Sequence, residues 1–425
     1  MGRGVLMVAL VLLFLNGCGE QAAPGSAGST GSTASPADSA QLAQGRYLLR
    51  AGGCRACHTR QGGQAYAGGR VVPTPFGNIY SPNITADDAT GIGGWSRDDF
   101  WQALHQGKSR DGRLLYPAFP FDSFTRVRRA DSDAMFAALQ ALSAVHRKNR
   151  PPELSFPYNQ RKLLTAWRAL YFDAGVYQDN PDKSDEWNRG AYLVEGIGHC
   201  KACHSPRNFL GASQAGRPLA GGFIAVQDWY APSLHDGPGG GLHGWTRQDI
   251  VDLLKTGRSA RGTAFGPMAE VVSQSLQYLH EADLEAIATY LLDQPRAPAV
   301  PAFAGVRPSP REAADLVSQG QKLYDKHCAD CHGEDGAGKG GVYPPLAGNT
   351  ALLGHPVNAI RAVLLGGFEP TTVANPRPYS MPPFAPHLDD REVAAVVSYL
   401  RASFGNQADA VSPRTGAKYR STPVR

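Results

Sequence analysis

The sequence predicts an all-α fold of three tandem domains joined by long loops rich in glycine and proline. The chain has 425 residues, and domains usually take roughly 100–200 residues each. The pattern Cys-x-x-Cys-His occurs three times, and a stretch with apolar residues at helical spacing follows each copy. The 49 glycines and 32 prolines indicate long loops between the helices.

The first residues have the pattern of a bacterial export signal. Arg3 precedes an apolar run from Val5 to Leu15, which is too short to cross a bilayer because crossing takes about 20 apolar residues. The run leads into Leu-Asn-Gly-Cys, which resembles a lipobox, so we expect 1–17 to be a lipoprotein signal peptide and Cys18 to carry lipid. Cleavage after Cys18 is the alternative. Residues 18–40 are mostly small or polar and predict a flexible linker.

The other cysteines form three pairs, each followed by a histidine. The pairs are Cys54 and Cys57, Cys200 and Cys203, and Cys328 and Cys331, and the histidines are His58, His204 and His332. Cys-x-x-Cys-His attaches c-type haem, because the two thiols form thioethers to the porphyrin and the histidine supplies the proximal iron ligand. A zinc site would need further cysteines. The sequence therefore predicts three covalently bound haem c groups and no disulfide.

A longer repeat surrounds each motif. A segment that starts with Gly45, Gly190 or Gly320 begins 9, 10 and 8 residues before the first cysteine and predicts a short entering helix. A Tyr-x-Pro loop follows each motif, at Pro82, Pro232 and Pro345. The repeat resembles class I cytochromes c, and this resemblance implies that each proline carbonyl accepts the second ring N–H of the ligating histidine. The alternative is that these prolines only shape turns.

Helix signals complete each repeat and set the domain boundaries. Ser96 and Thr246 are each followed three residues later by an acid, which predicts capped helices. Amphipathic closing helices are expected at 134–142, 283–291 and 392–400. We predict cytochrome c domains at 41–150, 185–298 and 313–405, a bridge at 151–184, a linker at 299–312 and a disordered tail at 406–425.

The distal iron ligands differ between the repeats. Met268 and Met381 lie in loops beside proline, between the helices of the second and third domains, and are the expected thioether ligands. In the first domain Phe119 stands about where methionine is expected. Met135, His105, water or an open site remain as alternatives there, and an open site would lower the haem potential or admit small ligands. His199 and His327 precede their motifs and are expected to be surface or helix residues.

Over nearly its whole mature length the chain resembles the three-haem cytochrome c subunits of bacterial periplasmic dehydrogenases. The segments that carry the resemblance are 76–85, 91–96 and 187–193, together with the three haem motifs. Two branches are close: partners of quinoprotein alcohol or flavoprotein gluconate-type dehydrogenases, and partners of molybdenum hydroxylases acting on aldehydes, isoquinoline or nicotinate. The loop at 116–120 and the bridge segment 154–161 leading to Trp167 look more like the second branch, because in the first this loop usually carries methionine.

The resemblance implies an electron-transfer subunit on the periplasmic side of a bacterial membrane. Its partners would be the catalytic subunit of a dehydrogenase and a quinone, a soluble cytochrome or a terminal oxidase. The sequence has no pattern of a flavin, molybdopterin or quinoprotein site, so we expect no catalytic residues. A net charge of +5 without a clustered basic stripe gives no support to nucleic-acid binding. The alternatives are an enzyme whose methionine-lacking first haem acts on peroxide or sulfur compounds, and a gas-sensing module.

Overall fold

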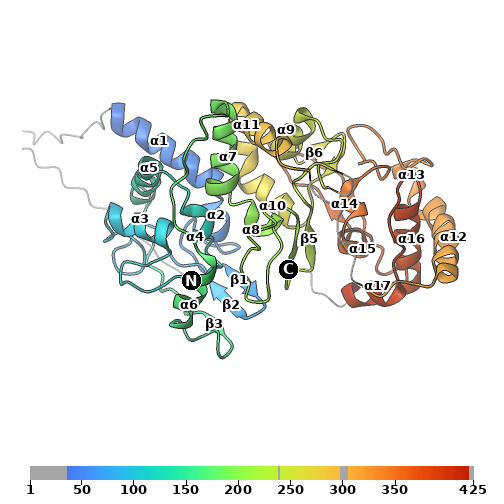
Figure 1. Ribbon diagram of the computed structural model, residues 1–425, viewed down its shortest axis with the longest axis horizontal. Coiled ribbons are helices and arrows are strands. Elements are labelled where there is room, and N and C mark those ends of the chain that lie inside the picture. Colours follow the sequence, from blue (N-terminus) through green and yellow to red (C-terminus); the bar gives the residue numbers. More distant parts are fainter. Residues whose placement is uncertain (1–35, 238–239, 297–304, 421–425) are drawn as a thin grey trace, which may run out of the picture.

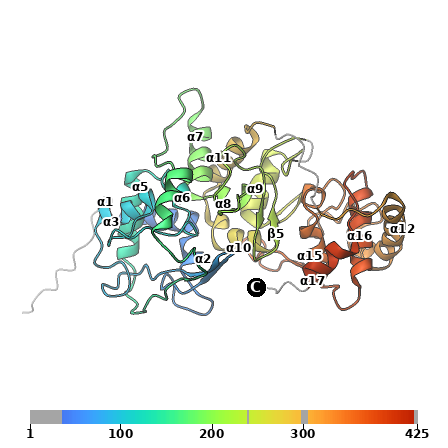
Figure 2. The ribbon, with the colours of Figure 1, turned by 60° about the horizontal axis from the view of Figure 1, so that its bottom comes forward.

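Three helical units follow one another along the long axis of the molecule. A computed structural model describes residues 36–237, 240–296 and 305–420. Unit 1 covers 36–150, unit 2 covers 185–296 and unit 3 covers 305–420, and two views show them in a row (Figures 1 and 2). The predicted signal peptide, Cys18 and the linker up to residue 35 lie outside the described residues.

In each unit the entering helix crosses the closing helix at a glycine. The helix pairs are α1 (Pro36–Ala51) with α5 (Arg129–Gln140), α7 (Asp185–Tyr192) with α11 (Glu281–Leu292), and α12 (Pro310–His327) with α16 (Asp390–Ala402). A Cβ on Gly45, Gly190 or Gly320 would lie 1.9, 1.9 or 2.1 Å from a main-chain oxygen of the closing helix. Side chains do not pack this closely, so only glycine permits the crossing.

A π-helical turn accounts for the longer spacing between this glycine and the motif in unit 2. The turn Leu193–Ile197 (η1) continues α7 and takes up the additional residue that precedes Cys200 in unit 2. The motifs then lie on the short helices α2 (Cys54–Cys57), α8 (Lys201–His204) and α13 (Ala329–His332). Unit 2 therefore keeps both the crossing and the motif despite its longer segment.

The two capped helices form as predicted. Ser96 and Thr246 begin α3 (Arg97–Gln106) and α9 (Arg247–Thr256), each in a capping box with the aspartate three residues on. Both helices end at a glycine with positive φ, Gly107 at 57° and Gly257 at 84°. In unit 3 the corresponding helix is α15 (Val357–Leu365).

The described part of the chain contains four small antiparallel sheets, which the prediction of an all-α fold did not include. They are β1 (Val71–Thr74) with β2 (Gly77–Tyr80) and β3 (Glu153–Leu154), β4 (Gly222–Ile224) with β5 (Trp229–Ala231), β6 (Arg258–Ser259) with β7 (Gly262–Thr263), and β8 (Gly367–Phe368) with β9 (Ser380–Met381). Strands of two to four residues are too short for a clear alternating pattern. The bridge adds β3 to the sheet of unit 1 and also forms α6 (Leu163–Tyr171).

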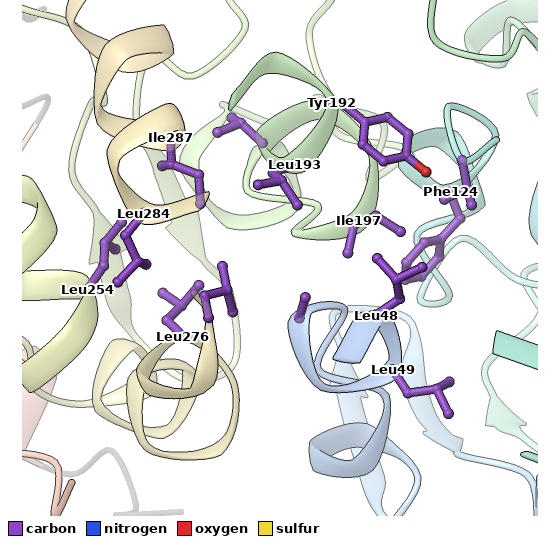
Figure 3. Close-up of a cluster of buried hydrophobic side chains, with 14 of the residues drawn as sticks. Leu48, Leu49, Phe124, Tyr192, Leu193, Ile197, Leu254, Leu276, Leu284 and Ile287 are labelled. Atoms are coloured by element: carbon purple, nitrogen blue, oxygen red, sulfur yellow. The ribbon is translucent and has the colours of Figure 1, made fainter. Parts of the chain in front are cut away.

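Units 1 and 2 share one hydrophobic core. Leu48 and Phe124 of unit 1 lie in the same buried cluster as Ile197 and Leu284 of unit 2 (Figure 3). Two reciprocal hydrogen bonds join the same units: the Tyr47 hydroxyl donates to Asp283, and the Tyr192 hydroxyl donates to Asp131 over 2.5 Å. The two tyrosines occupy equivalent positions of the repeat, as do the two aspartates. Unit 3 has a separate core.

The ends of unit 3 differ from the predicted boundaries. Its entering helix α12 begins at Pro310, inside the predicted linker 299–312. Helix α17 (Pro413–Arg420) lies in the predicted disordered tail, with Tyr419 buried and Arg420 bonded to Asp390, so the prediction of disorder was wrong for these residues. Similarly, α1 begins at Pro36, inside the predicted flexible linker. None of the described helices is long and apolar enough to span a bilayer.

Replacing Gly320 by alanine should destabilise unit 3 by roughly 1–3 kcal/mol, the usual cost of overpacking, because the methyl group would push α12 away from α16. Thermal unfolding followed by circular dichroism should show a lower melting temperature. Gly340 is the matched control, since a Cβ there meets no atom within 4 Å. Equal melting temperatures for Gly320→Ala and Gly340→Ala would contradict the close crossing.

Candidate functional site

The three predicted proximal histidines have the same surroundings. The Nδ1 atoms of His58, His204 and His332 lie 2.8, 2.7 and 3.3 Å from the main-chain oxygens of Pro82, Pro232 and Pro344. Pro345 was predicted for this role in unit 3, but the loop has two successive prolines and the first of them meets the histidine. With Nδ1–H donating to a carbonyl, the other nitrogen of each ring, Nε2, keeps the lone pair that can bind a metal.

Burial keeps these groups in their neutral forms. It lowers the pKa of all three histidines, against the opposing effect of the proline carbonyl. Burial also raises the pKa of Cys54 and Cys200 to about 12 and that of Cys328 to about 11. Redox-active dithiols have lowered thiol pKa values, so these cysteine pairs do not resemble a dithiol oxidoreductase site.

A basic side chain holds the loop between the cysteines in each unit. Arg70, Arg207 and Lys339 donate to the main-chain oxygens of Ala56, Ala202 and Asp330 over 2.8, 2.6 and 2.7 Å. Each accepting residue directly precedes the second cysteine of its motif. These three basic residues were not predicted, because they lie 13, 4 and 8 residues after the second cysteine of their motifs and so share no common spacing.

One large cavity reaches the motifs of both units 1 and 2. It has a volume of about 2470 Å³, and Cys57, His58 and Cys203 are among the residues that line it. Pockets for small molecules usually measure about 300–1,000 Å³, so this cavity can hold more than one large planar cofactor. The described residues contain no cluster of three metal-ligating His, Cys, Asp or Glu side chains. A large cavity lined by motif cysteines and a motif histidine therefore fits covalent haem better than a bare metal ion.

The predicted distal methionines pack against the same hydrophobic cores as motif cysteines, Met268 with Cys200 and Met381 with Cys328. Met268 is the second residue of α10 (Pro267–Gln274), and Met381 lies in β9, so neither is in the irregular loop that was expected. Both are half-buried against the hydrophobic cores, Met268 in the shared core and Met381 in that of unit 3.

The structure distinguishes the residues considered for the distal side of the unit 1 haem. Phe119 and Met135 both line the large cavity, whereas His105 does not. The Nδ1 atom of His105 lies 3.0 Å from the Thr125 carbonyl, and its ring stacks on Trp101. Met135 is fully buried in α5, as expected for a core residue.

His199 was wrongly expected to be a surface or helix residue. It is half-buried with φ at 41°, a conformation that costs energy outside glycine, and the equivalent residue of unit 1 is Gly53 at 61°. Its Nε2 lies 3.3 Å from the Gly52 carbonyl, and its ring meets the Phe124 ring edge-on. His199 thus connects the motif of unit 2 to that of unit 1. His327 ends α12 and fits the expectation.

Ion pairs join the units near these sites. Arg70, which holds the motif of unit 1, also forms a two-bonded ion pair with Glu270 in α10 of unit 2. Arg258 of unit 2 pairs with Glu369 of unit 3, and both side chains are largely buried. Each pair therefore links the neighbourhood of a methionine to the adjacent unit.

Comparisons with known proteins agree with this geometry. Residues 317–403 match the family Cytochrome c. A nicotinate dehydrogenase subunit of Pseudomonas putida is 43% identical over 371 residues, covering 85% of this chain, but the chain spans only 30% of that protein. The cytochrome c subunit of quinone alcohol dehydrogenase from Gluconobacter oxydans is 38% identical, with 86% of this chain and 79% of that protein covered. The fructose dehydrogenase cytochrome subunit of Gluconobacter japonicus is 38% identical, with 89% and 83% covered. With covalent haem c as its cofactor, the chain belongs to the family of cytochrome c subunits of dehydrogenases.

Proposed function

We propose that this chain is a three-haem cytochrome c that passes electrons from a periplasmic dehydrogenase to the respiratory chain. The observation that carries the proposal is the threefold repetition of one site: a Cys-x-x-Cys-His motif, a histidine held by a proline carbonyl, and a basic side chain on the motif loop. A single motif can arise by chance, but three with the same contacts support three haem sites. We infer that units 1, 2 and 3 are three cytochrome c domains.

The proposed roles follow from these contacts. The cysteine pairs 54/57, 200/203 and 328/331 attach the porphyrins, and His58, His204 and His332 are the proximal iron ligands. Met268 and Met381 supply the distal thioethers in units 2 and 3. When bound, the haem groups supply one-electron transfer. The proline carbonyl fixes each imidazole tautomer, and the apolar side chains of the cores would surround the iron; both would tune the potential.

The relatives support the proposed partner, and the first residues of the chain support the proposed location. The relatives are named as subunits of nicotinate, alcohol and fructose dehydrogenases, which supports a dehydrogenase catalytic subunit as electron donor. We propose a quinone, a soluble cytochrome or a terminal oxidase as acceptor, and attachment to the periplasmic side of a membrane through lipid on Cys18. The relatives give no support to an enzyme acting on peroxide or sulfur compounds.

Removing one cysteine pair should remove one haem. Purified wild-type protein should contain three covalent haem groups, measured by intact mass and by the alkaline pyridine spectrum, and the double variant Cys328→Ala/Cys331→Ala should contain two. Unit 3 has its own core, so units 1 and 2 should keep their haem groups. A wild-type protein with fewer than three would contradict the proposal.

Replacing Met268 by leucine should remove the distal thioether of unit 2 while keeping similar volume. We expect the far-red absorption typical of methionine-bound ferric haem to fall by about half, and one midpoint potential to drop, because a thioether ligand raises haem potential. Redox titration with optical detection measures both. Met381→Leu should do the same in unit 3, and an unchanged spectrum in either variant would refute that ligand assignment.

Cys18→Ser should abolish lipid attachment without changing the haem content, because Cys18 lies outside every haem motif. Metabolic labelling with a fatty acid and fractionation of the cells test this. Wild-type protein without label would rule out the lipid anchor.

A further inference from the structure

We propose that unit 1 offers an open coordination position to a neutral diatomic ligand such as carbon monoxide or nitric oxide, on the side of its haem that Phe119 covers. This inference rests on the proposed attachment of haem at Cys54 and Cys57. It goes further, because it assigns a ligand-binding site to one unit of a chain whose other units are closed by methionine. Three features of the structure carry it.

The first feature is the register of the two equivalent hairpins. Gly107 ends α3 and Gly257 ends α9, and each glycine carbonyl accepts a hydrogen bond that closes the following turn, from Leu115 N over 2.8 Å and from Ala264 N over 2.7 Å. Unit 1 has one more residue inside its turn. Counting four residues on from each closing residue leads to Phe119 in unit 1 and to Met268 in unit 2. A phenyl ring therefore occupies the position of the thioether.

The second feature is the anchoring of Phe119. Its ring stacks on Phe124 with centroids 5.3 Å apart, and Phe124 is buried and in turn meets His199 from unit 2. Phe119 and His58 line the same cavity. A phenyl group has no lone pair to donate to iron, so this side chain can fill space beside the metal without binding it.

The third feature is that the described neighbours offer no ready replacement ligand. The His105 ring lies outside the cavity lining and is held by the Thr125 carbonyl. His199 lines the cavity, but its ring is held at the Gly52 carbonyl, two residues before Cys54, and so lies on the motif side of unit 1. Met135 lines the cavity but is fully buried in α5, where Ile287 and Val396 occupy the equivalent core positions of the other units, one residue after the alanine that meets the crossing glycine. Isoleucine and valine at this position show that the fold needs an apolar core residue there, not a ligand.

The residues packed around Phe119 select the class of ligand. Phe119 packs against the buried cluster that contains Leu104, Met135 and Leu139, all of which also line the cavity. The nearest polar side chain along the loop, Tyr116, has its hydroxyl 3.5 Å from the Asn159 carbonyl and its ring beneath Arg161. An apolar site penalises anions because they lose hydration without gaining a partner. We therefore expect neutral diatomic molecules to bind in preference to cyanide or azide.

The test uses the full-length, dithionite-reduced holoprotein and carbon monoxide. After the haem content is fixed by the pyridine spectrum, optical titration should show one carbon monoxide bound per chain. Phe119→Met should weaken this binding by about tenfold or more, since a thioether would then compete for the iron. Met268→Phe should create a second site. Met135→Leu is the control and should bind carbon monoxide as the wild type does.

The outcomes separate this inference from the proposed function. Three haem groups with no carbon monoxide binding would overturn the open site and leave the electron-transfer role intact. Binding that appears only in Met135→Leu would identify Met135 as the ligand and also overturn the inference. Fewer than three haem groups in the wild type would overturn the proposed function itself. One bound carbon monoxide that Phe119→Met displaces would establish the site in unit 1.

Discussion

The close crossing of two helices at a glycine is the constraint on which each unit depends. Gly45, Gly190 and Gly320 let the entering helix touch the main chain of the closing helix, and the motif follows within three turns of helix. The crossing therefore fixes where the cysteines and the histidine lie. Unit 2 demonstrates how strict this is, because its additional residue is absorbed in the π-helical turn Leu193–Ile197 and not by a shift of the crossing.

Signals that are local in sequence were predictable, and contacts between distant segments were not. The motifs, the two capping boxes and the closing helices each depend on residues within a few positions of one another, so their spacing reveals them. The cations on the motif loops, the choice of Pro344 over Pro345 and the short strands depend on how loops fold back, and loop length varies between units. Helix α17 was missed because its burial depends on contacts with α16.

His199 is the clearest example of contacts between distant segments that the sequence could not predict. Its position next to a haem motif suggested a surface residue, because the sequence does not show that unit 1 packs against His199. Its positive φ and its contacts with Gly52 and Phe124 exist only because units 1 and 2 share a core. The sequence alone placed Phe119 about where methionine is expected, and the hairpin register gives it the position that Met268 has in unit 2. Only the folded chain shows that His105 lies outside the cavity lining.

Units 1 and 2 are best understood as one body. Arg70 donates to Ala56 in the motif of unit 1 and pairs with Glu270, two residues beyond Met268 in unit 2. Loss of one partner would leave a charge in a half-buried setting, so the two sites depend on each other's position. Cutting the chain in the bridge would also expose Leu48, Ile197 and their neighbours to water at a cost of about 25 cal/mol per Å² of apolar surface. Unit 3 has its own core, but Tyr230 of unit 2 packs against that core and stacks on His355. Arg361 of unit 3 also lies over the ring of Trp229, beside the Arg258–Glu369 pair and several loop hydrogen bonds. The sequence repeats one unit three times, but packing gives units 1 and 2 one common core and unit 3 a core of its own.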